Sequence, residues 1–273
     1  MTDIISNQHQ QVTDLFANIW KNYIEVTPSA HKIHQLLSSG TDLINDHVAY
    51  RTFNTAKVNL DKLAGHLVNL GYKHSGDYDF SSKKLNAKHF EHSDTSLPKV
   101  FISELRVEEF SVKVQNIIET MVSNIDESVI VDQSFLYSGT HWQVSKEDYQ
   151  TLLAESEYAA WIAAWGYRAN HFTVSINHLE NYDSIEDVNE AVKSSGFALN
   201  TTGGEVKGNS IVKLEQSSTM ADKATVQFSD GEAEIPSCFY EFAKRYPLEC
   251  GKLYSGFVAA SADKIFESTN AAT

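Results

Sequence analysis

The sequence contains few cysteines, few basic residues and no long apolar run. Its only cysteines are Cys238 and Cys250, and so few thiols favour a reducing compartment over a disulfide-bonded scaffold. No stretch approaches the roughly 18 apolar residues that a transmembrane helix requires. The N-terminal segment "MTDIISNQHQQ" lacks the basic and apolar regions of a secretory signal. Together these absences predict a cytoplasmic protein that does not contact a membrane.

The shortage of basic residues also limits the ligands that the protein can bind. Lysine and arginine number 22 against 36 aspartates and glutamates, and the formal net charge is −14. Nucleic acid is excluded as a partner, because its phosphates require clustered basic residues. The field of the whole molecule opposes any anionic ligand, so such a ligand needs local arginines. We therefore expect a small-molecule partner, and the sequence leaves the oligomeric state open.

An internal repeat organises the chain. The segment "NDHVAYRTFN" has a counterpart in "ANHFTVSIN", and their histidines, His47 and His171, lie 124 residues apart. Each histidine follows a polar residue and begins a run of alternating character that is typical of a strand. A helical pattern follows each run and ends at a glycine, Gly71 or Gly196, which is a common helix terminator.

Each copy is predicted to form a βαβββ module. Two such modules in tandem resemble the vicinal-oxygen-chelate superfamily, so we expect an α+β fold with a curled eight-stranded sheet. The chain, 1–273, is expected to form a single compact domain with modules at about 42–105 and 166–245, N-terminal helices at 8–39 and linker helices within 107–165. The later strands are predicted at about 72–79, 83–92 and 99–105 and at 197–201, 210–217, 223–229 and 236–244, and the linker helices at about 107–124 and 146–165.

The matched histidines predict a metal site between the modules. A mononuclear non-haem Fe(II) site uses two histidines and one carboxylate and leaves neighbouring positions open for substrate and dioxygen. His47 and His171 supply the histidines, and the carboxylate is expected from a late strand beside them. Glu241 is preferred because its strand follows His171 in the second module, whereas Glu104 is assigned a structural role at a position that could be equivalent to Glu241.

Other polar residues on the predicted strands have less definite roles. Arg51 lies four residues after His47, so on a strand both face the same side. Arg245 shares a face with Glu241, either as a second anion anchor or in a structural ion pair. The segment "KHFEH" places His89 and Glu91 on one face and His92 on the other, which indicates a solvated strand rather than a metal site.

The segments "DHVAYRTF", "NHFTVSIN" and "FYEFAKRY", in this order, resemble those of the 2-oxoadipate dioxygenase/decarboxylase family, also called 2-hydroxyglutarate synthases. The likeness runs from about residue 12 to residue 260. The resemblance implies that His47, His171 and Glu241 bind Fe(II) and that Arg51 binds the distal carboxylate of the substrate.

The reaction implied by this resemblance converts a 2-oxo dicarboxylic acid, 2-oxoadipate, and O₂ into a 2-hydroxy acid, 2-hydroxyglutarate, and CO₂ in lysine catabolism. Two alternatives remain open. One is a metal-dependent lyase, isomerase or glyoxalase-like enzyme on the same fold, which would favour Zn or Ni and use an additional carboxylate or glutamine ligand, with Glu104 as the candidate carboxylate. The other is a non-catalytic module that binds a metal or a small acid. A purified sample could also contain zinc or nickel in place of iron.

Overall fold

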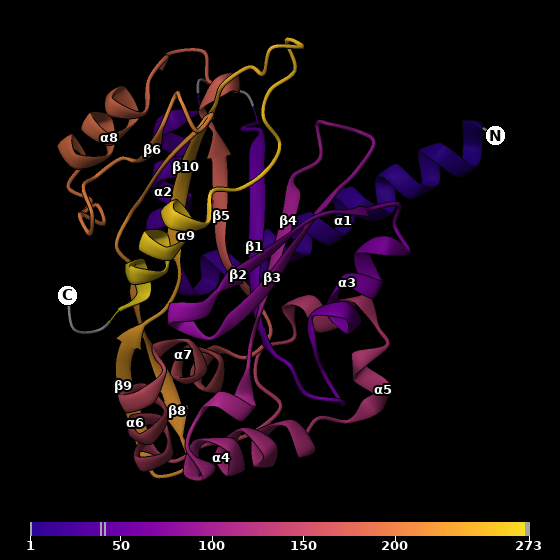
Figure 1. Ribbon diagram of the computed structural model, residues 1–273, viewed down its shortest axis with the longest axis vertical. Coiled ribbons are helices and arrows are strands. Elements are labelled where there is room, and N and C mark those ends of the chain that lie inside the picture. Colours follow the sequence, from indigo (N-terminus) through magenta and orange to yellow (C-terminus); the bar gives the residue numbers. More distant parts are fainter. Residues whose placement is uncertain (1, 39, 41, 271–273) are drawn as a thin grey trace.

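A curled eight-stranded sheet forms the centre of the molecule (Figure 1). The computed structural model describes residues 2–38, 40 and 42–270, so the predicted end of the N-terminal helices at residue 39 lies outside the described residues. The strands follow the order β2-β3-β4-β1-β5-β10-β7-β6. Their bounds are β1 Asn45–Phe53, β2 Lys73–Phe80, β3 Leu85–Glu91, β4 Lys99–Leu105, β5 Ala169–Ser175, β6 Lys207–Asn209, β7 Leu214–Ser218 and β10 Phe239–Arg245.

The strand order confirms the two predicted modules. β1 and β5 pair antiparallel at the centre of the sheet, and each is flanked by a parallel partner, β4 or β10. Antiparallel strands continue outward from each partner to β2 on one edge and β6 on the other. The helix that follows each central strand ends as expected, because Gly71 and Gly196 adopt positive φ angles of 97° and 87°.

Three details of the second module differ from the prediction. The strand predicted at 210–217 begins later, at Leu214, and ends at Ser218. Residues 197–201 form no strand, and only an isolated bridge joins Leu199 to Thr219. Strands β8 (Lys223–Phe228) and β9 (Gly231–Pro236) form a separate hairpin outside the main sheet. Because Pro236 ends β9, the strand predicted at 236–244 begins later, at Phe239. The hairpin is an insertion before the last strand of the module, and its alternating residues have the same pattern as a strand of the main sheet.

The helices between and around the modules also depart in part from the prediction. The segment expected as one helix at 146–165 is two, because Ser156 is extended and its side chain accepts a hydrogen bond from the amide of Ala159, so it caps the second helix. Ser145 caps the first helix, where its hydroxyl accepts a hydrogen bond from the amide of Asp148. The helices are α1 Thr2–Val26, α2 Pro28–Leu37, α3 Leu60–Val68, α4 Val112–Ser123, α5 Glu127–Ile130, α6 Lys146–Glu155, α7 Glu157–Trp165, α8 Ile185–Ser194 and α9 Ala259–Ile265.

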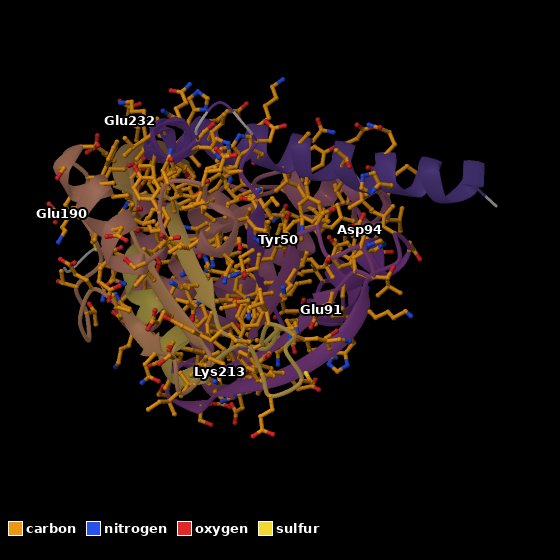
Figure 2. All side chains as sticks on the ribbon, turned by 90° about the horizontal axis from the view of Figure 1, so that it is seen from above. Tyr50, Glu91, Asp94, Glu190, Lys213 and Glu232 are labelled. Atoms are coloured by element: carbon orange, nitrogen blue, oxygen red, sulfur yellow. The ribbon has the colours of Figure 1, made fainter. Side chains whose placement is uncertain are left out.

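The two faces of the sheet have different roles. Helices α1, α2, α3 and α8 pack on the outer face, and in Figure 1 α1 runs behind the central strands. The C-terminal helix α9 lies in front of the sheet and contacts both edge strands, β2 and β6, so it closes the curl. Side chains fill the interior, where Tyr50 is buried, while Glu190 and Glu232 lie at the periphery (Figure 2). Within the described part of the chain, no helix is long and apolar enough to cross a membrane.

Gly166 provides a test of the junction between the linker helices and the second module. It has φ +63° and ψ −143°, a backbone region that is essentially limited to glycine. An added Cβ atom would lie 2.2 Å from the carbonyl oxygen of Gly139. We expect Gly166→Ala to lower the free energy of unfolding by about 3 kcal/mol or more. Gly196→Ala is the matched control, because its Cβ meets nothing within 4 Å, and it should cost about 1–2 kcal/mol. Equal losses in urea unfolding would contradict this explanation.

Candidate metal centre

Three strands place His47, His171 and Glu241 around one point on the inner face of the sheet. Thr173 of β5 pairs with His47 of β1 on one side and with Glu241 of β10 on the other. His171 lies two residues before Thr173 and therefore faces the same side. All three side chains are buried, with Glu241 0 % exposed. The antiparallel pairing of β1 with β5 thus brings together residues that are far apart in the sequence.

The donor atoms of these side chains are close enough to share one cation. The Nε2 atom of His171 lies 3.1 Å from one carboxylate oxygen of Glu241, and the Nε2 atom of His47 lies 3.7 Å from the other. One donor atom from each residue lies within 4.8 Å of the other two. The group could therefore hold a metal ion, and it is the only such cluster of histidine, cysteine, aspartate or glutamate among the residues that the structure describes.

The residue before each histidine fixes its ring. The Nδ1 atom of His47 lies 2.8 Å from a carboxylate oxygen of Asp46, and the Nδ1 atom of His171 lies 3.1 Å from the amide oxygen of Asn170. In the tautomer that donates its Nδ1 proton to this oxygen, each imidazole presents a lone pair on Nε2, the arrangement of histidines that ligate metals. The only sequence signal for these partners was that both histidines follow a polar residue.

The charges at the site fit a bound cation. Burial alone would raise the pKa of Glu241, but His47, His171 and a hydrogen bond from Gln216 together lower it, so the carboxylate is ionised. Burial also lowers the pKa of His171, although Glu241 opposes this effect, so the imidazole stays neutral at pH 7. One oxygen of the buried carboxylate accepts no hydrogen bond. A buried carboxylate anion is costly unless a cation neutralises it.

Gln216 is a site residue that the sequence did not indicate. Its amide nitrogen donates to the Oε1 atom of Glu241 at 2.6 Å, and its own amide oxygen is buried without a partner. Gln216 also lines the same cavity as the two histidines. No periodicity or motif singled it out, because it reaches Glu241 only through the antiparallel pairing of β7 with β10.

Glu104 is not equivalent to Glu241, which corrects the suggested symmetry. Strand pairing places Phe101 opposite Ala49 in the first module, where Glu241 stands opposite Thr173 in the second. Glu104 points to the outer face, and its carboxylate accepts a hydrogen bond from the amide of Leu60 at the start of α3. The expected structural role is thus correct. Glu104 is therefore not available as the additional carboxylate ligand of a glyoxalase-like site.

Arg51 lies in the same cavity and is only partly satisfied. It is 2 % exposed, and its Nη1 atom donates to the carboxylate of Glu157 at 3.1 Å, while Nη2 donates to the hydroxyl of Thr269 at 2.9 Å. The ring centres of Tyr158 and Trp161 lie 4.9 and 5.1 Å from the guanidinium carbon. The Nε–H group is buried without a partner. A second anion could therefore bind Arg51 from the cavity.

Apolar side chains form most of the wall of this cavity. The ring of Phe239 stacks on His171 with centroids 4.5 Å apart, and the ring of Phe257 meets His47 edge-on at 4.8 Å. Phe257 and Phe266 enter from the C-terminal part of the chain. The polar groups thus converge in an apolar chamber, which is the usual composition of a small-molecule site.

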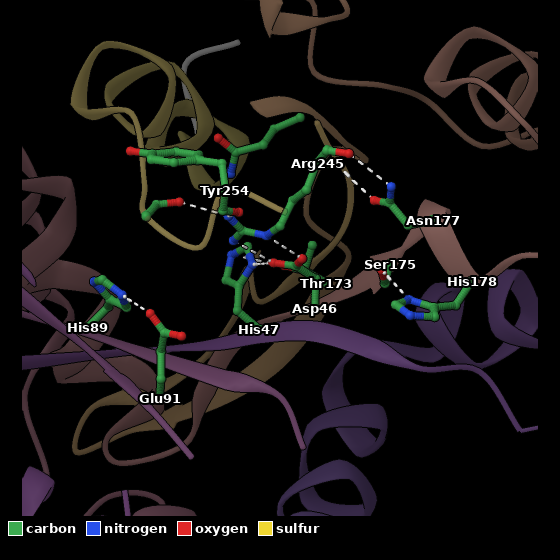
Figure 3. Close-up of polar contacts among 12 residues, drawn as sticks. Asp46, His47, His89, Glu91, Thr173, Ser175, Asn177, His178, Arg245 and Tyr254 are labelled. Atoms are coloured by element: carbon green, nitrogen blue, oxygen red, sulfur yellow. Dashed lines mark hydrogen bonds and ion pairs between the residues drawn. The ribbon is translucent and has the colours of Figure 1, made fainter. Parts of the chain in front are cut away.

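The prediction of a solvated strand for "KHFEH" is wrong at His89. The imidazole of His89 is 2 % exposed, and one ring nitrogen contacts Glu91 at 3.0 Å (Figure 3). Its other ring nitrogen contacts the hydroxyl of Tyr78 at 2.9 Å. The C-terminal segment covers this strand, which strand alternation alone could not indicate. His89 is nevertheless separate from the group formed by His47, His171 and Glu241.

Comparisons with known proteins agree with this site. The sequence profile of the 2-oxoadipate dioxygenase/decarboxylase family matches residues 1–253. The chain is 35 % identical to a rice protein named 2-oxoadipate dioxygenase/decarboxylase, chloroplastic/amyloplastic, over 94 % of this chain and 78 % of the relative. A crystal structure of rice hydroxyglutarate synthase in complex with 2-oxoadipate superposes with a TM-score of 0.91 at 34 % identity, over 97 % of this chain and 93 % of that one.

A structure from Shewanella frigidimarina, described provisionally as a hydrolase, is 63 % identical and has a TM-score of 0.89, over 91 % of this chain and 98 % of that one. Its description names no substrate. The high identity over almost its whole length means that the two chains share the same fold.

The ion pair behind His47 should dominate the acid sensitivity of the protein. Burial opposes ionisation of Asp46, but Arg245 and His47 hold the pKa of Asp46 well below its usual 3.8. A lowered folded-state pKa contributes stability that is complete above the unfolded-state pKa and is lost as the pH falls. We expect Asp46→Asn to cost about 3–5 kcal/mol at pH 7. In urea unfolding, this difference from wild type should shrink below about pH 4. A difference that is constant down to pH 3 would contradict the assignment.

Proposed function

Because this chain belongs to the 2-oxoadipate dioxygenase/decarboxylase family, we propose that it is an Fe(II)-dependent dioxygenase that converts 2-oxoadipate and O₂ into 2-hydroxyglutarate and CO₂. The equation balances, since the five-carbon product and CO₂ contain all atoms of the six-carbon acid and of O₂. The observation that carries the proposal is the convergence of His47, His171 and Glu241 in one buried cavity with Arg51.

In this proposal the three ligands come from the two modules. His47, His171 and Glu241 form one face of the coordination sphere, the pattern of two histidines and one carboxylate found in non-haem iron oxygenases. Asp46 and Asn170 keep the Nε2 lone pairs directed at the ion. Iron, when bound, would supply open positions for the chelating acid and for O₂, together with the redox chemistry that the reaction needs. The supporting observation is the donor set itself, with one oxygen of Glu241 left without a hydrogen bond.

Arg51 is proposed to bind the distal carboxylate of the substrate. Arg51 lines the cavity and its buried Nε–H group has no partner, and a guanidinium suits a paired grip on a carboxylate. Glu157 and Thr269 accept hydrogen bonds from the other two nitrogens and so fix the orientation of the guanidinium group. Phe257 and Phe239 exclude water from the histidines. These residues would bind and orient a dicarboxylic acid against the open face of the metal site.

Oxygen consumption tests the proposed reaction directly. Protein reconstituted with Fe(II) under anaerobic conditions should, on exposure to O₂, consume oxygen and release CO₂ in equal amounts with 2-oxoadipate. A panel of 2-oxo acids with four to seven carbons defines the length preference. His171→Ala should lower the rate by at least about 100-fold, because a two-ligand site holds iron poorly. Iron-loaded wild-type protein that consumes no oxygen with any acid of the panel would refute the proposal.

The role of Arg51 is tested with a matched pair of substrates. 2-Oxohexanoate has the chain length of 2-oxoadipate but lacks the distal carboxylate. Arg51→Met should raise KM for 2-oxoadipate by roughly 30- to 900-fold, which corresponds to about 2–4 kcal/mol for a buried charge-assisted pair. The same variant should change KM for 2-oxohexanoate much less. If the variant affects both acids equally, Arg51 does not recognise the distal carboxylate.

A further inference from the structure

A single guanidinium joins the candidate metal site to the segment that covers it. The Nε and Nη2 atoms of Arg245 donate to the two carboxylate oxygens of Asp46 at 2.6 and 2.8 Å. The remaining nitrogen, Nη1, donates to the carbonyl oxygens of Tyr254 and Gly256 at 2.9 and 2.7 Å (Figure 3). The side chains of Asp46 and Arg245 are each 3 % exposed. Arg245 therefore forms a structural ion pair rather than a free anchor for an anion.

The segment held by Arg245 carries the apolar cover of the site. Directly after Gly256, the ring of Phe257 lies edge-on to His47 and lines the cavity. The Arg245 guanidinium carbon is 5.2 Å from the centre of the same ring. The backbone amide of Phe257 donates to the hydroxyl of Tyr78 at 3.0 Å, which provides a second anchor from β2. The position of Phe257 is thus defined by Arg245 from one side and Tyr78 from the other.

We propose that Asp46 and Arg245 are positioning residues that couple metal binding at His47 to the placement of Phe257 over the cavity. Asp46 orients the imidazole of His47 through its Nδ1 atom, and Arg245 orients Asp46 while it holds the carbonyls of residues 254 and 256. The proposal deepens the proposed function and rests on the metal site described there.

The other histidine lacks such a connection, and the contrast supports the assignment. His171 contacts Asn170, which is neutral, and the amide nitrogen of Asn170 is buried without a hydrogen-bond partner. Asn170 therefore orients His171 without a charged residue behind it that links it to the covering segment. Although the two modules are related by pseudo-symmetry, only the first one continues from its histidine through a charged pair to the covering segment.

Thermodynamic linkage requires the coupling between the metal site and the covering segment to act equally in both directions. If a metal ion binds more tightly when His47 and Asp46 are held in place, the bound ion stabilises the same arrangement by the same factor. The effect should reach residues 254–257, because Arg245 contacts Asp46 and these carbonyls simultaneously. Hydrogen-bonding partners of metal-ligating histidines typically contribute 10- to 100-fold to metal affinity.

Titration with Co(II) measures the first consequence without relying on catalysis. Asp46→Asn should bind Co(II) about 10- to 100-fold more weakly than wild type in competition with a chelator. The double variant Asp46→Asn/Arg245→Met leaves no uncompensated buried charge and should be weakened to a similar extent. Glu104→Gln is the control, because it removes a carboxylate from the outer face of the same sheet. It should bind Co(II) like wild type.

Hydrogen exchange of the wild-type protein measures the second consequence and does not depend on whether a variant folds. Addition of Co(II) should slow exchange of the peptide that covers residues 254–257 by about tenfold. Unchanged exchange on Co(II) binding, or Co(II) affinity of the two Asp46 variants within twofold of wild type, would overturn the coupling and leave the proposed function intact. A wild-type protein that binds neither Co(II) nor Fe(II) would overturn both.

Discussion

The buried carboxylate of Glu241 is the constraint on which the site depends. It is 0 % exposed, faces two imidazoles and leaves one oxygen without a hydrogen bond. An isolated anion in such a place is expensive. A divalent cation satisfies the carboxylate and both Nε2 lone pairs at once. The curled sheet brings these groups together, because the central β1–β5 pair carries one histidine from each module and β10 adds the carboxylate.

The repeat supplies an approximate two-fold arrangement that the protein uses asymmetrically. Both histidines are matched in position, yet the place that Glu241 occupies in the second module belongs to Phe101 in the first. A strictly symmetric pair of modules would bring two carboxylates to one ion. The second carboxylate would add another negative charge to the site. Phe101 lines the cavity, so that side of the site is apolar. Arg51, which has no charged counterpart in the second module, then supplies positive charge in a protein of net charge −14.

The sequence predicted the parts of the fold that follow from local periodicity and from the repeat. Both modules and the convergence of His47, His171 and Glu241 could be anticipated, because each depends on spacing along the chain or on matched positions. The break at Ser156 and the β8–β9 hairpin could not, since a polar residue within an apolar helix and an extra pair of alternating strands resemble what surrounds them. Gln216 and the burial of His89 result from contacts between distant segments, which a single sequence does not encode locally.

The central claim is that these three side chains bind one cation, and a crystal structure of protein soaked with Fe(II) under anaerobic conditions tests it most directly. Anomalous scattering at the iron edge should reveal one strong peak in the cavity, about 2.0–2.2 Å from the Nε2 atoms of His47 and His171 and from a carboxylate oxygen of Glu241. An iron peak elsewhere in the molecule, or no peak in a cavity whose side chains keep the described arrangement, would contradict the account.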